Sequence, residues 1–120
     1  MKAKHIPYTA QELQSMFEYN KGSLFWNKRE ETSRYLKTWN SKWAGKEAGA
    51  IHKSGYKQVK LNDIIYPIHR IIFKYHNNSI NNDLQIDHID ANKLNNNISN
   101  LRLVTSQENC LHRERMKCPQ

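Results

Sequence analysis

The stretch that decides the fold begins with LQIDH at residues 84–88 and continues with LRLVTSQEN at residues 101–109. Leu84 and Ile86 alternate with polar residues, which is typical of a strand with one buried face. Residues 101–104 predict a second strand, and an asparagine-rich loop of about ten residues separates the two. Thr105 and Glu108 have the spacing of a capping box, so a helix is expected to start there and to run to about residue 116. The predicted order is strand, long loop, strand, helix.

Polar side chains with the chemistry of a metal site lie at the ends of these predicted elements. Asp87 and His88 end the first strand, and Asn109 lies in the first turn of the helix. If the strands pair and the helix folds across them, Asp87 and Asn109 offer two oxygen ligands, which suit Mg²⁺ or Mn²⁺. Neighbouring strand residues point to opposite faces, so His88 needs a bend at the strand end to join Asp87.

The first half of the chain predicts further short elements. Thr9 and Glu12 form another capping box, and the apolar spacing after it predicts a helix over residues 10–19. A short strand is expected at 23–26, irregular structure at 28–50, and a hairpin of strands 56–61 and 64–68 with its turn at 62–63. Pro67 predicts that the second hairpin strand either lies at the edge of the sheet or ends near this residue. A short helix over 69–76 completes an α+β fold, a small mixed domain with an N-terminal helix and a β-hairpin region.

The charge balance indicates a polyanionic partner. The 120 residues hold 19 Lys and Arg against 11 Asp and Glu, a formal net charge of +8. Nucleic acid is the first expectation, and a solvated basic face without a ligand is the alternative. The densest basic stretch is 34–60, which supplies the candidate DNA contacts Lys42, Lys46, Lys53 and Lys57. We expect Trp26, Trp39 and Trp43 to form core or a platform for the irregular basic segment rather than to stack on bases.

Other classes of protein are not indicated. The apolar runs are too short for a membrane span, and the N-terminus has no secretory signal. Two cysteines are too few for a disulfide framework or a four-cysteine zinc site. An intracellular protein with reduced thiols is therefore expected.

The second half of the chain resembles the HNH endonucleases of phages and phage introns, in the variant with Asn at the last position. The resemblance rests on the segments His69–Ile72, Ile86–Asp90, Asn96–Asn97, Asn100–Arg102, Val104–Thr105 and Glu108–Asn109. Looser similarity in the first half rests on Leu24–Trp26, Ala44–Gly49 and Gly55–Tyr56. The resemblance to HNH endonucleases implies a ββα-metal motif and a metal-dependent DNA endonuclease of phage or prophage origin. Such a protein would work in the cytoplasm of an infected or lysogenic bacterial host.

The resemblance also implies a role for individual residues. His88 resembles the general base, Asp87 and Asn109 the ligands of one Mg²⁺ or Mn²⁺ ion, and Asn100 the residue that fixes the loop and so orients the histidine. No structural zinc is expected, because the chain has no CxxC pair. Four further residues are candidates with open alternatives. Arg102 and Arg113 either contact phosphate or are solvated surface residues. His69 either contacts the site or makes a structural hydrogen bond, and His112 either contacts the site or lies on the surface. Asn95, Asn96 and Asn97 are expected to be turn residues rather than ligands.

We therefore expect a basic DNA-binding region at 1–68 and an HNH nuclease region at 69–120, together one compact unit acting on double-stranded DNA. With one site per chain, a monomer would nick one strand, and a double-strand break would need a homodimer or two successive nicks. Two alternatives remain open. One is a DNA-binding protein that has lost activity, and the other is an accessory factor of the phage packaging terminase that nicks only with its partner.

Overall fold

The computed structural model describes residues 6–77, 84–105 and 107–108. Within these ranges the helices are α1 (Ala10–Met16), α2 (Arg34–Trp43) and α3 (Ile68–Asn77), with a 3₁₀ turn, η1 (Ile98–Asn100). The strands are β1 (Phe17–Asn20), β2 (Ser23–Trp26), β3 (Ala50–Ile51), β4 (Lys57–Leu61), β5 (Ile64–Pro67), β6 (Gln85–His88) and β7 (Leu101–Val104). They pair as three small antiparallel sheets, β1–β2, β3–β4–β5 and β6–β7. The expected α+β class is confirmed.

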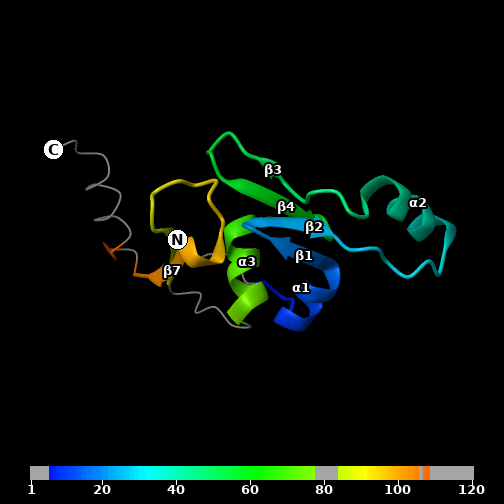
Figure 1. The fold of residues 1–120 in the computed structure, drawn as a ribbon, viewed down its shortest axis with the longest axis horizontal. Helices are drawn as coiled ribbons and strands as arrows, with labels where there is room; N and C mark the ends of the chain where they lie inside the picture. Colours follow the sequence, from blue (N-terminus) through cyan, green and yellow to red (C-terminus); the bar gives the residue numbers. More distant parts are fainter. Residues whose placement is uncertain (1–5, 78–83, 106, 109–120) are drawn as a thin grey trace.

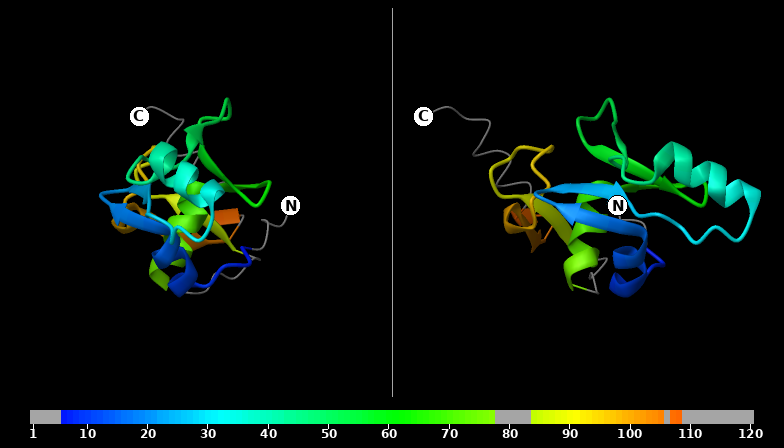
Figure 2. Two further views of the ribbon diagram at one scale, coloured as in Figure 1. Left: turned by 90° about the vertical axis from the view of Figure 1, so that its right-hand side faces the viewer. Right: turned by 45° about the vertical axis from the view of Figure 1, so that its right-hand side comes forward.

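The described elements are spread along one long axis, since the molecule measures 56 × 26 × 23 Å. Figure 1 shows α2 at one end of this axis and β7 toward the other, with α1, α3 and the β1–β2 hairpin between them. The right-hand view of Figure 2 shows the same separation. None of the described helices combines the length and the apolar character that crossing a membrane requires.

The hydrophobic core joins the two halves of the chain. Ile71 and Ile72 of α3 are fully buried together with Leu13 of α1, Phe17 of β1 and Leu24 of β2. Each such side chain contributes about 1.5–3 kcal/mol through burial. The same core cluster includes Ile86 and Leu101, so the β6–β7 hairpin is attached to the body that the N-terminal elements build.

Two expectations about the N-terminal half are wrong. The helix expected over 10–19 ends at Met16, and the next four residues form β1, which pairs with β2. This pairing takes the backbone hydrogen bonds that a longer helix would use and buries Phe17. The segment 28–50 is not irregular, because it contains α2, whose N-cap Ser33 accepts a hydrogen bond from the backbone of Leu36, and β3.

The remaining elements follow the predictions closely. The Thr9–Glu12 capping box is present in both directions. Asn62 and Asp63 have positive φ values of 49° and 63°, the left-handed backbone of a tight hairpin turn. Pro67 ends β5, an edge strand, and α3 begins at the next residue. The division of the chain after residue 68 stays a prediction.

Candidate active site

Asp87 and His88 end strand β6, and both are buried, with 4% and 5% of their surface exposed. The β6–β7 register pairs Asp87 with Arg102 and His88 with Leu101. As strand alternation requires, the two side chains have different neighbours: Asp87 meets Arg102, and His88 meets the asparagine loop and a cluster of rings. The strand end therefore carries a carboxylate and an imidazole on two successive residues, each with its own set of neighbours.

A single side chain sets the orientation of the His88 ring. Nε2 of His88 lies 2.8 Å from Oδ1 of Asn96, which is 2% exposed. An amide oxygen only accepts hydrogen bonds, so Nε2 carries the hydrogen and Nδ1 keeps the lone pair. The sequence analysis treated Asn96 as a turn residue and missed this contact. Because three asparagines follow one another in an irregular loop, no sequence periodicity indicates which of them points inward.

Asn100 fixes the loop that carries Asn96. Its Nδ2 donates to Oδ1 of Asp90 and to the backbone oxygen of Asn95, both at 2.9 Å, and its Oδ1 accepts from the backbone N–H of Asp90 at 3.1 Å. Its backbone oxygen accepts from Ile89 at 2.8 Å. Hydrogen bonds from the Asn95 amide, from the Asn92 backbone and from Asn100 hold the pKa of the Asp90 carboxyl below its usual value. Asn100 thus holds the backbone next to Asn96, which contacts His88, and its role in orienting the histidine stays a prediction.

Two further rings lie against His88. The His69 ring is 5.0 Å from the His88 ring between centroids, and the Tyr56 ring is 5.4 Å from His69 and 6.0 Å from His88. Lys93 Nζ lies 4.8 Å from the centroid of Tyr56 and donates to the backbone oxygen of Ser54 at 3.2 Å. Burial, with smaller contributions from His88 and Arg70, lowers the pKa of His69 to about 3. His69 is therefore a neutral neighbour of His88 at pH 7.

Asp87 and Arg102 form a cross-strand ion pair. Nε and Nη2 of Arg102 both lie 3.0 Å from Oδ2 of Asp87, and about half of the arginine side chain remains exposed. The carboxylate oxygens of Asp87 are the type of ligand that Mg²⁺ and Mn²⁺ prefer, so this donor fits the expected ion. The second expected ligand, Asn109, lies outside the described residues, as do His112 and Arg113. No group of three or more His, Cys, Asp or Glu among the residues that the structure describes could hold a metal ion.

The predicted start of the last helix is present. The backbone N–H of Thr105 donates to Oε1 of Glu108 at 3.0 Å, and the backbone N–H of Glu108 donates to Oγ1 of Thr105 at 3.1 Å. Residues 107 and 108 are helical. The capping-box hydrogen bonds and the helical backbone of residues 107 and 108 thus follow β7 in the chain.

The candidate DNA-binding lysines differ in their surroundings. Three of them are exposed: Lys42 lies in α2, Lys46 follows α2, and Lys53 lies between β3 and β4. Lys57 is ion-paired with Glu47, whose pKa this lysine holds below its usual value. Lys42 and Lys46 lie in α2 and just after it, whereas Lys53 precedes Ser54, whose backbone oxygen accepts a hydrogen bond from Lys93 beside Tyr56.

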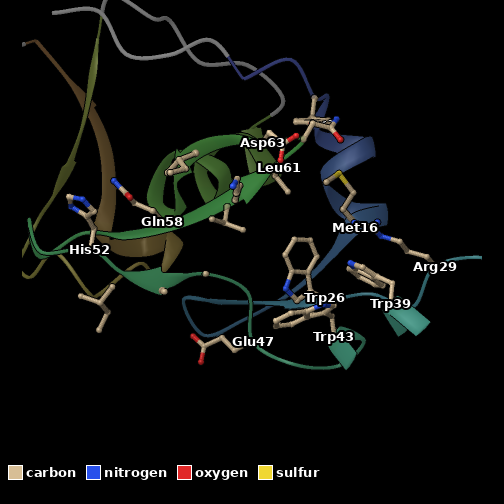
Figure 3. Close-up of a pocket in the computed structure, with 18 of the residues that line it drawn as sticks. Met16, Trp26, Arg29, Trp39, Trp43, Glu47, His52, Gln58, Leu61 and Asp63 are labelled. Carbon is tan, nitrogen blue, oxygen red and sulfur yellow. Dashed lines mark hydrogen bonds between the residues drawn. The ribbon is translucent and has the colours of Figure 1, made fainter. Parts of the chain in front are cut away.

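An open groove of about 900 Å³ lies between α2 and the β3–β4–β5 sheet, as Figure 3 shows. Trp26 and Trp39 pack edge to face at its rim, which agrees with their expected platform role. None of the residues that surround His88 lines this groove. The groove and the candidate site are therefore separate features.

Residues 66–111 match the family model described as HNH endonuclease. Because of this similarity we call residues 66–111 the HNH region. The match covers β6, the asparagine loop, β7 and the start of the last helix, which are the elements that carry Asp87, His88, Asn96 and Asn100. The resemblance to HNH endonucleases drawn from the sequence is confirmed for these residues.

Two known proteins extend the comparison beyond the HNH region. Over 58 residues, 48% of this chain, the sequence is 43% identical to the SPbeta prophage-derived putative HNH homing endonuclease YosQ of Bacillus subtilis (strain 168). The fold is similar to that of the HNH homing endonuclease I-HmuI, in a structure that describes DNA binding and cleavage, with a TM-score of 0.58 at 25% identity over 85% of this chain. The matched parts cover 34% of the YosQ sequence and 53% of the I-HmuI chain. This chain thus spans only part of the length of both proteins.

Proposed function

We propose that this protein is a divalent-metal-dependent DNA endonuclease that hydrolyses phosphodiester bonds to 5′-phosphate and 3′-hydroxyl ends. The proposal is supported by the HNH region and by the two HNH homing endonucleases that the chain resembles. The observation that carries it is the buried His88, whose Nε2 is engaged by Asn96. A histidine held in this way at a strand end, one residue after a buried carboxylate, is suited to base catalysis.

His88 acts as the general base in this proposal. Its Nδ1 lone pair takes a proton from the water molecule that attacks phosphorus, while Nε2–H stays bonded to Asn96. Such a base contributes about 10²–10⁴-fold to the rate. The neutral His69 ring and the Tyr56 ring limit the positions that the imidazole can take. Asn100 holds the loop in which Asn96 lies.

Asp87 and Asn109 would hold one Mg²⁺ or Mn²⁺ ion. When bound, the ion would supply charge stabilisation for the pentacoordinate phosphorus and for the leaving 3′ oxygen. Arg102 already contacts the Asp87 carboxylate and is partly exposed, so it lies where a phosphate of the same DNA strand could be bound. In this proposal Arg102 holds Asp87 and also binds a phosphate.

The substrate in this proposal is double-stranded DNA. Its phosphates would be contacted by basic residues along the chain, namely Lys42, Lys46, Lys53, Lys57, Arg102 and Arg113. A monomer carries one site and would nick one strand, whereas a homodimer would cut both. The prophage origin of the YosQ relative supports a phage-related protein that works in the bacterial cytoplasm.

The proposal is tested by incubating the purified protein with supercoiled plasmid in Mg²⁺, in Mn²⁺ and in EDTA. Open-circular or linear DNA is expected with either metal and not with EDTA. His88→Ala should abolish cleavage and leave DNA affinity within a few-fold. His76→Ala, at the exposed end of α3, is the matched control and should cut like the wild type.

Three outcomes would change the assignment. Cleavage by His88→Ala at the wild-type rate would remove His88 as the base. Equal losses of binding and cleavage in this variant would make its role structural. Retained DNA binding without cleavage by the wild type would favour the silent DNA-binding protein or, if a terminase partner restored nicking, the packaging factor.

A further inference from the structure

Helix α2 is held to the rest of the protein by one face. Nδ2 of Asn40 donates to the backbone oxygen of Arg29 at 2.7 Å, and Oδ1 of Asn40 accepts from the backbone N–H of Arg29 at 2.8 Å. The Arg29 guanidinium lies 3.7 Å from the centroid of Trp39, and Trp39 packs edge to face on Trp26 with centroids 5.5 Å apart. These contacts fix the direction of the helix and the face that it presents outward.

The opposite face of α2 is basic and polar. At about 100° per residue, positions 34, 37, 38, 41 and 42 lie on the side of the helix away from Leu36, Asn40 and Trp43. All five are exposed, and we call them the α2 stripe: Arg34, Lys37, Thr38, Ser41 and Lys42. The helix holds no acidic residue, whereas Glu30 and Glu31 precede its N-cap and Glu47 follows its end. The stripe from Arg34 to Lys42 is about 12 Å long.

The α2 stripe lies far from His88. Figure 1 and the right-hand view of Figure 2 show α2 projecting at one end of the 56 Å long axis, with the loop before β7 toward the other end. B-form DNA rises about 3.4 Å per base pair, so a molecule of this length can follow about 16 base pairs. One duplex can therefore reach both ends of the protein.

We infer that the α2 stripe binds the phosphate backbone of the duplex at a distance from the phosphodiester that is cut. This inference rests on the proposed endonuclease function. It assigns phosphate contact to two further residues, Arg34 and Lys37. The charge of the stripe complements phosphate, and its Ser and Thr hydroxyls are ordinary phosphate donors. A membrane surface fits less well, because the α2 stripe itself holds no apolar residue. The aromatic residues of the helix, the exposed Tyr35 and Trp43 together with Trp39, line the groove instead.

The test compares three proteins on one duplex over a series of salt concentrations. The first is the wild type, and the second replaces charge with Arg34→Gln and Lys37→Gln. The third keeps charge at the same positions with Arg34→Lys and Lys37→Arg. All five positions of the stripe are exposed, so folding should be unaffected, and circular dichroism checks it.

The charge-removing variant should bind roughly tenfold more weakly at moderate salt, with the slope of log K against log salt reduced by about 0.9 per lost phosphate contact. The charge-keeping variant should bind like the wild type. At saturating protein, the single-turnover cleavage rate of both should equal that of the wild type, because the stripe does not touch the reacting atoms.

Unchanged affinity and slope in the charge-removing variant would overturn the inference while leaving the nuclease proposal intact. A reduced saturating rate would also overturn it, since the stripe would then act at the reaction centre. Loss of binding to phosphatidylglycerol vesicles, with DNA binding unchanged, would assign the stripe to a membrane instead. If the wild type neither bound nor cut DNA, the proposed function itself would fail.

Discussion

Nε2 of His88 lies 2.8 Å from Oδ1 of Asn96, and both side chains are buried although eight residues separate them in the sequence. This contact fixes the tautomer of the imidazole and leaves Nδ1 as the basic nitrogen. It is made from a loop rather than from a strand or helix, so the loop must itself be held. Asn100 supplies that restraint through its bonds to Asp90 and Asn95.

Asn96→Ala should lower the single-turnover cleavage rate by roughly tenfold to a hundredfold, because the His88 ring loses the partner that orients it. DNA affinity should remain within a few-fold. The buried Nε2–H is left without its acceptor, so the free energy of unfolding should also fall by about 1–3 kcal/mol. Rapid-quench kinetics and urea unfolding measure the two effects. Asn92→Ala, an exposed position in the same loop, should behave like the wild type, and a normal rate in Asn96→Ala would exclude the positioning role.

His69 should make the folded protein less stable in acid. Its pKa is about 3 in the folded state against an ordinary value of 6.5, so folding favours the neutral ring. The stabilisation is complete above pH 6.5 and is lost as the pH falls from 6.5 toward 3. Between pH 7 and pH 4.5 the loss should be about 2–3 kcal/mol. Urea unfolding at the two pH values should show this loss in the wild type and in His52→Gln, but much less of it in His69→Gln. Equal losses in all three proteins would contradict the assignment.

The basic residues proposed to contact DNA should not contribute equally. Neutralising Lys42, Lys46 and Lys53 one at a time should lower the salt slope of binding by about 0.9 for each phosphate contact that is lost. Lys57→Gln should lower it less, because this lysine is already paired with Glu47. Glu47→Gln, which frees Lys57, should strengthen binding at low salt. Gel-shift titrations over a salt series measure the slopes, and equal effects at Lys53 and Lys57 would show that the ion pair does not matter.

Gly22 joins the β1–β2 turn to the asparagine loop. Its φ is +87°, and a Cβ there would lie 2.8 Å from the backbone nitrogen of Asn97. Gly22→Ala should therefore destabilise the protein by about 1–3 kcal/mol and displace the loop that holds His88. The midpoint temperature of thermal unfolding and the cleavage rate should both be lower than in the wild type. Gly45→Ala is the control: it has a similar φ of +81° with nothing near the added carbon, so it should lose stability through backbone strain but keep its cleavage rate.

Local sequence patterns determined most of the elements. The Thr9–Glu12 and Thr105–Glu108 capping boxes, the Asn62–Asp63 turn and the two strands of the HNH region depend on residues that are neighbours along the chain. Their signals are therefore visible without the fold. The same holds for Asp87, His88 and Asn100, which were singled out by spacing and by their resemblance to HNH endonucleases.

Tertiary structure decided the rest. Residues 17–20 became a strand because β2 was available to pair with them, and α2 formed where its Trp39 and Asn40 could pack on Trp26 and Arg29. Among three consecutive asparagines, Asn96 alone contacts His88, since the fold turned it inward. Such outcomes depend on contacts between residues distant in sequence, and only the folded chain supplies the partners. The sequence by itself thus determined the local elements and the main candidate residues, whereas packing determined which side chains hold the imidazole in place.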